Sequence, residues 1–255
     1  MTTVEICIDD VEGAPLAEAC GAHRVEVCAA LSDGGTTPSI GLVGQILADV
    51  RTLAVSVMIR PRAGNFVYSP AEIDVMCADI AAVRALHAPQ GVEVGFVVGA
   101  LTADGLVDTA LLRRLVATCG PAPVTFHRAF DTLPDLPAAL EVLIGCGVRR
   151  VLTSGGAGSA REGADTLRRL VDTAAGRITV MAGGSVRGEN VADLVARTGV
   201  RAVHLRAVEL VGGAGTASAT AVSYDVGARP VTSARPIRDV LESLAALPEG
   251  PGPRS

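Results

Sequence analysis

The sequence predicts a single α/β domain folded as a closed TIM (β/α)8 barrel. Eight short runs rich in Val and Ile alternate along the chain with helical patterns, at intervals of roughly 20 to 37 residues. Alternation of this kind predicts a parallel sheet with helices outside it. Eight units in 255 residues match the size of a TIM barrel. An open doubly wound sheet is the alternative, but no strand is followed directly by a G-x-G-x-x-G loop.

The composition is that of a globular protein with a large apolar core. Apolar residues make up 49% of the chain and charged residues 19%, with a net charge of −5. Because there is no basic patch and aromatic residues are only 2%, we expect no nucleic-acid partner. No apolar run is long enough to cross a bilayer and the first residues do not resemble a signal peptide, so we expect a cytoplasmic protein without membrane contacts.

Each element in the first half of the chain has a local signal. The first helix follows Asp9 or Asp10 and ends at Gly21, which are favoured capping residues. Ser69 with Glu72 three residues later is typical of a helix start. The expected strands are 4–8, 24–28, 54–59 and 92–98, and the expected helices are 11–20, 39–50, 69–86 and 108–118.

The second half continues the same alternation, up to an unusual last unit. After the eighth strand, residues 208–220 are rich in Gly, Ala, Ser and Thr, and we expect a long mobile loop. We expect residues 1–247 to form the domain and 248–255 a disordered tail. The expected strands begin at 124, 150, 178 and 202, and the expected helices are 136–144, 160–174, 189–197 and 235–247.

Polar and sulfur-containing side chains recur on the face of the strands that points into the barrel. In the fifth strand, alternation places Thr125 and His127 on one face and Val124 and Phe126 on the other. A structural barrel would be filled with Val, Ile and Leu, and buried charges are costly, so we expect a functional cavity at the carboxyl ends of the strands. The inward set is Glu5, Cys7, Asp9, Arg24, Glu26, Cys28, Ser56, Met58, Arg60, Thr125, His127, Thr153 and His204.

One hypothesis from this set is an enzyme that acts on a small anionic substrate, phosphorylated or carboxylate. Glu26 and His127 would be the acid and base, with Arg60 and Arg62 as an anion clamp and His204 as a further catalytic candidate. Backbone N–H groups at the ends of strands six and seven could also hold the anion. The residues of that second anion site are Thr153, Ser154, Gly155, Gly183 and Gly184.

Each of these assignments has a structural alternative. His127 could be a structural hydrogen-bonding residue rather than an acid or base. Glu26 could pair with Arg60 and Glu5 with Arg24, while the glycines could simply permit tight turns. Asp131 could cap the helix that follows the fifth strand.

A second hypothesis is a metal site at Cys7 and Cys28. The two cysteines end adjacent strands on the same face, and two thiolates are soft ligands suited to Cu(I) or Zn(II). The alternative is a pair of small buried residues in a tapering barrel. The other four cysteines fall on helices or at helix ends, and we expect them to be reduced core thiols.

Several stretches together resemble the CutC family, which is named for copper homeostasis. The resemblance implies a TIM barrel, a cytoplasmic location, self-association as a dimer or tetramer, and a link to copper tolerance with Cu(I) as the bound ion. The segment after strand eight departs from relatives of the family. The matching stretches are Glu5-Ile6-Cys7, 24–28, 34–39, 58–62, 124–131, 151–155 and 181–184.

Overall fold

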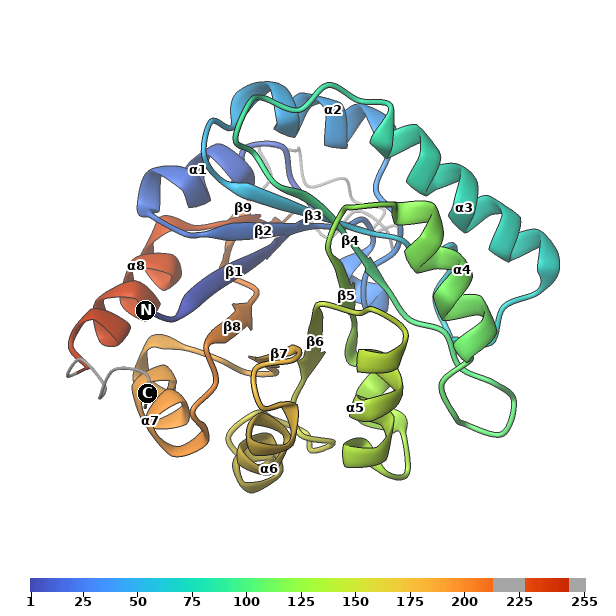
Figure 1. The fold of residues 1–255 in the computed structure, drawn as a ribbon. Helices are drawn as coiled ribbons and strands as arrows, with labels where there is room; N and C mark the ends of the chain where they lie inside the picture. The colour runs from blue at the N-terminus through green and yellow to red at the C-terminus, as the bar shows by residue number, and fades with distance from the viewer. Residues whose placement is uncertain (213–227, 248–255) are drawn as a thin grey trace, which may run out of the picture.

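The computed structural model, which describes residues 1–212 and 228–247, contains a closed barrel of eight parallel strands (Figure 1). The strands follow one another around the barrel in chain order, and β8 closes it by pairing with β1. This confirms the predicted TIM barrel. The strands are β1 Thr3–Ile8, β2 Arg24–Val27, β3 Ala54–Met58, β4 Val94–Val98, β5 Val124–Phe126, β6 Arg150–Thr153, β7 Thr179–Gly183 and β8 Ala202–Leu205.

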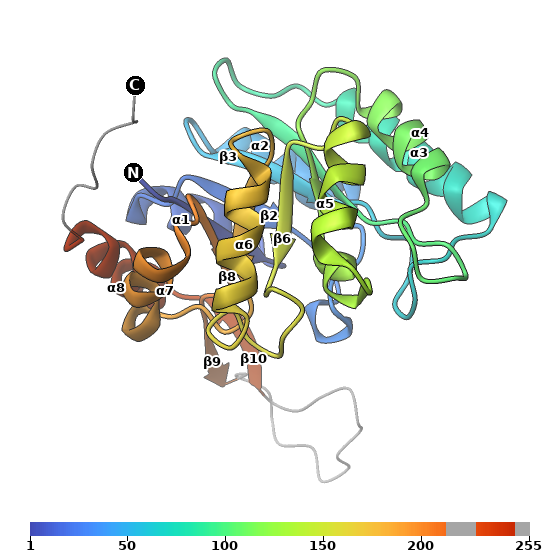
Figure 2. The same ribbon diagram turned by 60° about the horizontal axis from the view of Figure 1, so that its bottom comes forward.

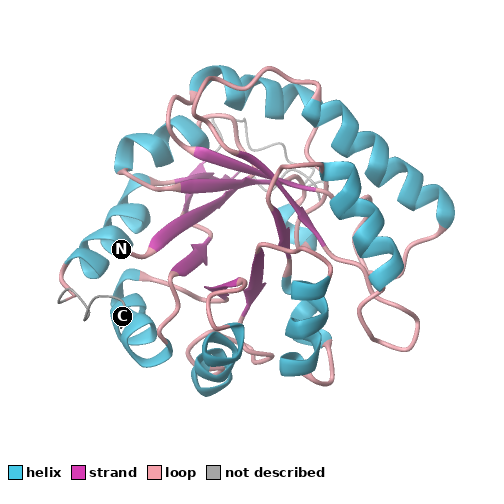
Figure 3. Cartoon of the chain, viewed as in Figure 1, coloured by secondary structure: helices cyan, strands magenta, loops and turns pink. Residues whose placement is uncertain are grey.

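Helices surround the strands (Figure 3), and the described residues contain eight α-helices. The predicted capping box is present in α3, where Ser69 accepts a hydrogen bond from the backbone of Glu72 and the Glu72 side chain accepts one from the backbone of Ser69. None of the described helices is long and apolar enough to cross a membrane. The helices are α1 Gly13–Cys20, α2 Ile40–Asp49, α3 Pro70–Arg84, α4 Thr109–Cys119, α5 Leu136–Gly145, α6 Ala164–Ala174, α7 Gly188–Thr198 and α8 Ala234–Ala245.

The main hydrophobic core lies between the strands and the helices. Outward-facing strand residues such as Val25, Val55 and Phe126 are fully buried in it. Two small apolar clusters are separate from this core, and both are built from inward-facing strand residues. The burial pattern confirms the alternation read from the sequence, because the inward positions hold the buried polar and sulfur-containing side chains.

The prediction of a long loop after β8 was wrong for the first residues of that segment. Val208–Gly212 forms β9, which pairs in antiparallel fashion with β10, Ala228–Thr232, a strand that the sequence analysis did not expect. Figure 2 shows this hairpin projecting from the barrel beyond β8. Leu210 is 76% exposed, so the strand has little of the buried pattern by which strands are predicted. Residues 213–220 of the expected loop and the expected tail, 248–255, lie outside the described residues.

The fifth strand is shorter than its sequence pattern indicates. It ends at Phe126, and His127 instead begins a short 3-10 helix, η2 (Arg128–Thr132), whose Ala129 N–H donates to His127 Nδ1. A second 3-10 helix, η1 (Leu31–Asp33), follows β2. Helix α6 begins at Ala164 rather than at residue 160. These changes at strand ends build the loops that cover the barrel mouth.

Candidate functional site

A cavity of about 380 Å³ lies at the carboxyl ends of the strands. Cys7 of β1, Glu26 of β2 and His204 of β8 line one part of it, while His127 lines it from the start of η2. The apolar part of the cavity wall is formed by Leu31, Met58 and Leu152. Arg60 also lines this cavity, so five of the six predicted catalytic and metal-binding residues share it, as closure of the barrel requires.

The sulfur atoms of Cys7 and Cys28 lie 3.9 Å apart. Both thiols are free and buried, and the Met58 side chain packs in the same small cluster. Cys7 lies opposite Glu26 in the register between β1 and β2, and Cys28 follows two residues later, with its N–H bonded to the Ile8 carbonyl. The sequence reading of two adjacent sulfurs is thus correct in geometry, and Met58 adds a thioether that it did not assign to the site.

Below the sulfurs, Glu5 accepts hydrogen bonds from two directions. Arg24 Nε donates to its Oε2, and His204 Nδ1 lies 2.7 Å from its Oε1. Burial alone would raise the pKa of Glu5, but the Arg24 charge and the His204 hydrogen bond lower that pKa to about 2. The Glu5–Arg24 pair considered from the sequence is confirmed. The carboxylate also orients the imidazole, so that His204 Nε2 faces Glu26 Oε2 at 3.8 Å.

Cys7, Glu26 and His204 form a tightly coupled group. A hydrogen bond from Cys28 lowers the pKa of Cys7 to about 5 against the effect of burial. Burial and the Cys7 charge raise the pKa of Glu26 well above its usual range. Burial would lower the pKa of His204, but Glu26, Cys7 and Glu5 raise it. One ligand atom from each of the three lies within 4.8 Å of the others, which is close enough to share a metal ion.

Arg60 and His127 lie together elsewhere on the cavity wall. The Arg60 guanidinium donates to the carbonyls of Asp33, Gly35 and Gly64, so the suggested pair with Glu26 was wrong. The reason is that the loop after β2 folds over Arg60 and presents its carbonyls there. His127 Nε2 is buried and has no hydrogen-bond partner among the residues that the structure describes. Burial and the Arg60 charge lower the pKa of His127 to about 3.

Arg62 lies outside the cavity, although the sequence analysis places it in the anion clamp. Its guanidinium is held by the Glu72 carboxylate and by the carbonyls of Asn65 and Val67. A loop that turns back after Pro61 directs this arginine toward the start of α3 instead of the barrel mouth.

The predicted anion site at the end of β6 is occupied by the side-chain carboxylate of Asp131. The N–H groups of Ser154 and Gly156 and the hydroxyl of Thr153 all donate to the carboxylate of Asp131. Asp131 therefore does not cap α5, which is capped by Asp135. Thr153, Ser154 and Gly155 are buried beside this carboxylate and do not line the cavity.

The glycines at the end of β7 serve packing. A side chain on Gly183 would place a Cβ atom 2.5 Å from Leu152 Cδ1. Gly184 has a φ of 106°, which L side chains rarely adopt, and neither glycine lines the cavity. The structure thus favours the alternative reading of these glycines as turn and packing residues.

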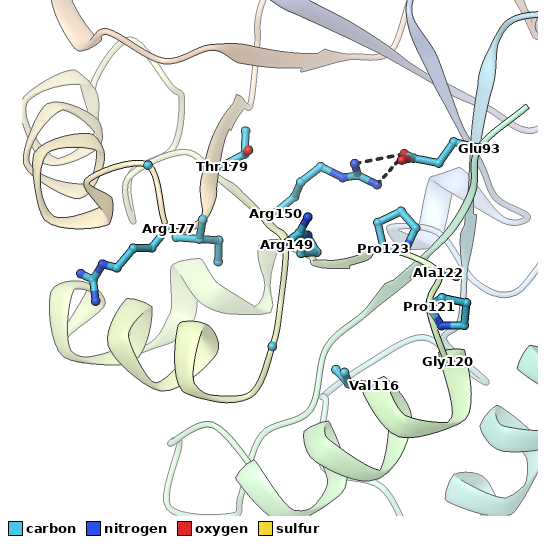
Figure 4. A pocket seen from close by; sticks show the side chains of 13 residues that line it. Glu93, Val116, Gly120, Pro121, Ala122, Pro123, Arg149, Arg150, Arg177 and Thr179 are labelled. Atoms are coloured by element: carbon cyan, nitrogen blue, oxygen red, sulfur yellow. Dashed lines mark hydrogen bonds and ion pairs between the residues drawn. The ribbon is translucent and has the colours of Figure 1, made fainter. Parts of the chain in front are cut away.

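A larger cavity of about 580 Å³ lies at the opposite, amino-terminal ends of the strands (Figure 4). Two of the three arginines that line it, Arg150 and Arg177, already have partners. Arg150 contacts Glu93 and Thr125, and Arg177 points away from Arg150 toward Glu141. In TIM barrels this end serves stability, whereas the carboxyl ends carry activity. We therefore place the candidate site in the cavity at the carboxyl ends.

Phe66 is a site residue that the sequence analysis missed. It lies in the loop between β3 and α3, where no periodicity marks it, yet its ring centroid is 4.9 Å from that of His127 and 5.0 Å from Arg60 Cζ. The only available signal was its position shortly after the Arg60-Pro61-Arg62 turn.

Comparison with known proteins decides the family. Residues 2–209 match the model of the CutC family. The chain belongs to the CutC family. The match covers every strand of the barrel and the first residues of β9.

Relatives of this CutC chain carry names that refer to copper. A human protein named copper homeostasis protein cutC homolog is 47% identical over 204 residues, which is 80% of this chain and 72% of the human one. A CutC family protein of Chromobacterium violaceum is 43% identical over 246 residues, covering 94% of this chain and 97% of its own.

Solved structures agree on the fold. A crystal structure of CutC from Streptococcus agalactiae is 33% identical and superposes with a TM-score of 0.73, covering 80% of this chain and 98% of the other. A phosphoribosylanthranilate isomerase from Thermotoga maritima superposes with a TM-score of 0.56 at 13% identity, covering 97% of this chain and 100% of the other. At that identity the likeness shows the TIM-barrel fold alone.

Proposed function

We propose that this CutC chain binds Cu(I) through Cys7 and Cys28 as part of a role in copper homeostasis. The observation that carries the proposal is the 3.9 Å separation of the two sulfur atoms. Two metal–sulfur bonds of about 2.3 Å each can span up to about 4.6 Å, so one ion fits between the sulfurs. Thiolate and thioether ligands select soft Cu(I), and Met58 lies in the same cluster.

The surroundings of the sulfurs support this role. Cys7 is held toward its thiolate form, which is the form that binds metal. His204, oriented by Glu5, and Glu26 lie close enough to contribute a further ligand or to take up the proton that binding releases. The copper homeostasis names of the relatives agree with a soft-metal site, although those names describe the relatives.

The test is an anaerobic Cu(I) titration against a competing chelator. In the Cys7→Ser, Cys28→Ser double variant, affinity should fall more than about 100-fold, since loss of outer-shell partners alone costs 10- to 100-fold. The matched control is Cys20→Ser, Cys77→Ser, in which two partly buried thiols outside the cavity are removed and affinity should not change. Equal affinity of both double variants would contradict the proposal.

A second function is favoured by a separate observation. Glu26 Oε1 and His127 Nε2 are buried without hydrogen-bond partners in the part of the chain that the structure describes, and both residues line the same cavity. Unpaired buried polar atoms are costly, and a bound substrate would pair them. We therefore propose that the cavity also acts on a small anionic substrate, with Glu26 as the proton-transferring group.

The test of this second function is proton exchange followed by nuclear magnetic resonance. A panel of small organic acids is incubated with the protein in D2O, and wild type should replace one carbon-bound hydrogen by deuterium faster than buffer does. Glu26→Gln removes the transferable proton and keeps the shape, so it should reduce exchange to the buffer rate. If wild type exchanges no acid in the panel, the enzymatic function is wrong.

We also propose that the chain works in the cytoplasm as a homo-oligomer, following the resemblance to the CutC family. Sedimentation velocity across a concentration series should give a dimer or tetramer mass. A monomer mass at every concentration would refute self-association.

A further inference from the structure

Arg60 is a buried cation without a carboxylate partner. Its side chain lines the cavity and the residue is only 5% exposed. The hydrogen bonds it makes go to backbone carbonyls, and no ion pair joins it to a carboxylate among the residues that the structure describes. Its Nε atom has no acceptor within residues 1–212 and 228–247. Burial of an unpaired charge is unfavourable, so we expect an anion to bind this guanidinium.

His127 presents a second donor without an acceptor. Its Nδ1 accepts the Ala129 N–H at 3.1 Å, which fixes the proton of the neutral imidazole on Nε2. The ring cannot easily turn away, because it packs against Gly99 so closely that a Cβ atom there would lie 2.0 Å from His127 Cε1. His127 Nε2–H is therefore a fixed donor, and it has no partner among the described residues.

The two donors share one apolar neighbour. The Phe66 ring contacts both the His127 ring and the Arg60 guanidinium, at 4.9 and 5.0 Å. An imidazolium beside Arg60 would place like charges together, so His127 is neutral and the pair carries one positive charge. One charge and two N–H donors match the two oxygens of a carboxylate.

A phosphate group matches Arg60 and His127 less well than a carboxylate does. A phosphate dianion would leave one negative charge uncompensated beside Arg60. The backbone N–H groups of Ser154 and Gly156, near the strands where TIM barrels often bind phosphate, already bind Asp131. The apolar parts of the cavity, Phe66 and Leu152, favour a ligand with a short hydrocarbon part.

We propose that Arg60 and His127 form a subsite that binds the carboxylate of a small organic acid, with the apolar part of the acid against Phe66. The proposal rests on the second function above, because it names the substrate class of that site, and it does not depend on copper. The cavity volume of about 380 Å³ limits the ligand to a small molecule. His127 is then a hydrogen-bond donor that positions the substrate, and Glu26 remains the group that transfers the proton.

The test measures binding without turnover. Sodium acetate, butyrate and pyruvate are titrated at up to high millimolar concentrations into 15N-labelled protein, and the side-chain Arg Nε–H and His Nε2 resonances are followed. At least one acid should bind and shift the resonances of Arg60 and His127. Butyramide, a neutral analogue of butyrate, and inorganic phosphate should bind at least tenfold more weakly.

Two variants assign the effect to the subsite. His127→Asn keeps a side-chain acceptor for the Ala129 N–H and removes the Nε2–H donor, so affinity for the bound acid should fall about tenfold or more. His87→Asn, on an exposed histidine in another loop, should bind like wild type.

The outcomes separate this inference from both proposed functions. Binding that is unchanged in His127→Asn, phosphate binding tighter than that of every carboxylate, or no binding of any of the three acids would each overturn the subsite. Carboxylate binding that depends on His127 but comes with no proton exchange would uphold the subsite and refute the enzyme. Proton exchange that persists unchanged in His127→Asn would uphold the enzyme and refute the subsite.

Discussion

Glu5 bonds two side chains that come from opposite ends of the chain. Arg24 and His204 both bond its carboxylate, and Glu5 itself is 0% exposed. A buried carboxylate with two bonded partners keeps its charge, and this charge in turn orients the imidazole that faces Cys7 and Glu26. The arrangement of the site therefore depends on a residue that does not line the cavity.

Glu5→Gln should destabilise the protein strongly. The change leaves Arg24 buried without its counter-charge, and breaking a buried pair costs about 3–5 kcal/mol. In a domain of this size, that loss lowers the melting temperature by roughly 6 to 20 °C. Thermal melts followed by circular dichroism measure it. Glu141→Gln is the matched control, because it breaks the exposed pair with Arg177 and should melt close to wild type.

His127 should make the stability depend on pH in a defined window. Its pKa falls from an ordinary 6.5 to about 3 in the folded protein, so below pH 6.5 the unfolded chain binds a proton that the folded one does not. Stability is therefore complete above pH 6.5 and is lost as pH falls, by about 2 kcal/mol between pH 6.5 and 5. The pKa of His204 is raised in the folded protein, so the contribution of His204 to stability is present below pH 6.5 and is lost as pH rises above that value.

Urea unfolding at several pH values measures this slope. Wild type should lose stability faster than His127→Asn between pH 6.5 and 5, and the difference between the two isolates His127 from other titrating groups. Parallel pH profiles for the two proteins would show that His127 is not held neutral by burial.

For single residues, the sequence predicted which side chains are buried and two contacts between neighbouring strands, but not the contacts that the loops make. Strand alternation placed Glu5, Glu26 and His127 inside the barrel, and all three are buried. It did not predict that Arg60 would bond loop carbonyls or that Asp131 would fill the anion site at the end of β6. Those partners lie in loops, where no periodicity constrains the direction of a side chain.

Among the elements, most helix ends were predicted well, but the β9–β10 hairpin was not. The predicted cap of the first helix was also wrong, because α1 has Glu12 rather than Asp9 or Asp10 at its N-cap and Asp10 bonds Thr232 instead. Ser69 with Glu72 and Gly21 mark helix ends through local hydrogen bonds, so their signals need no tertiary context. The hairpin is held at its base by a distant residue. Asp10 Oδ2 accepts hydrogen bonds from Thr232 N at 3.1 Å and from Thr232 Oγ1 at 2.5 Å. A contact across 222 residues leaves no local pattern.

Asp10→Ala should loosen the base of the hairpin. The loss of two hydrogen bonds, each worth about 1 kcal/mol, should speed amide exchange over residues 228–232 by roughly fivefold or more, while the barrel strands keep their protection. Hydrogen–deuterium exchange with mass spectrometry measures it. Asp104→Ala, in an exposed turn, is the control. Unchanged exchange at 228–232 would show that Asp10 is not the anchor.

At the scale of the whole molecule, closure of the barrel creates the site. β1 pairs with β8, and this brings Glu5 and His204 together across 199 residues of sequence. Eight alternating units made this closure predictable, and with it the shared cavity. The loops over the cavity were not predictable, because η1, η2 and the position of Phe66 depend on contacts made only in the folded barrel.

The proposed Cu(I) site lies between the sulfurs of Cys7 and Cys28, and this claim can be tested by X-ray absorption at the copper K-edge of the Cu(I)-loaded protein. The method distinguishes sulfur neighbours at about 2.3 Å from nitrogen and oxygen neighbours at about 2.0–2.2 Å. Wild type should show a shell dominated by at least two sulfurs, and the Cys7→Ser, Cys28→Ser variant should lose that shell. A wild-type shell of nitrogen and oxygen alone, or a sulfur shell that survives in the variant, would contradict the claim.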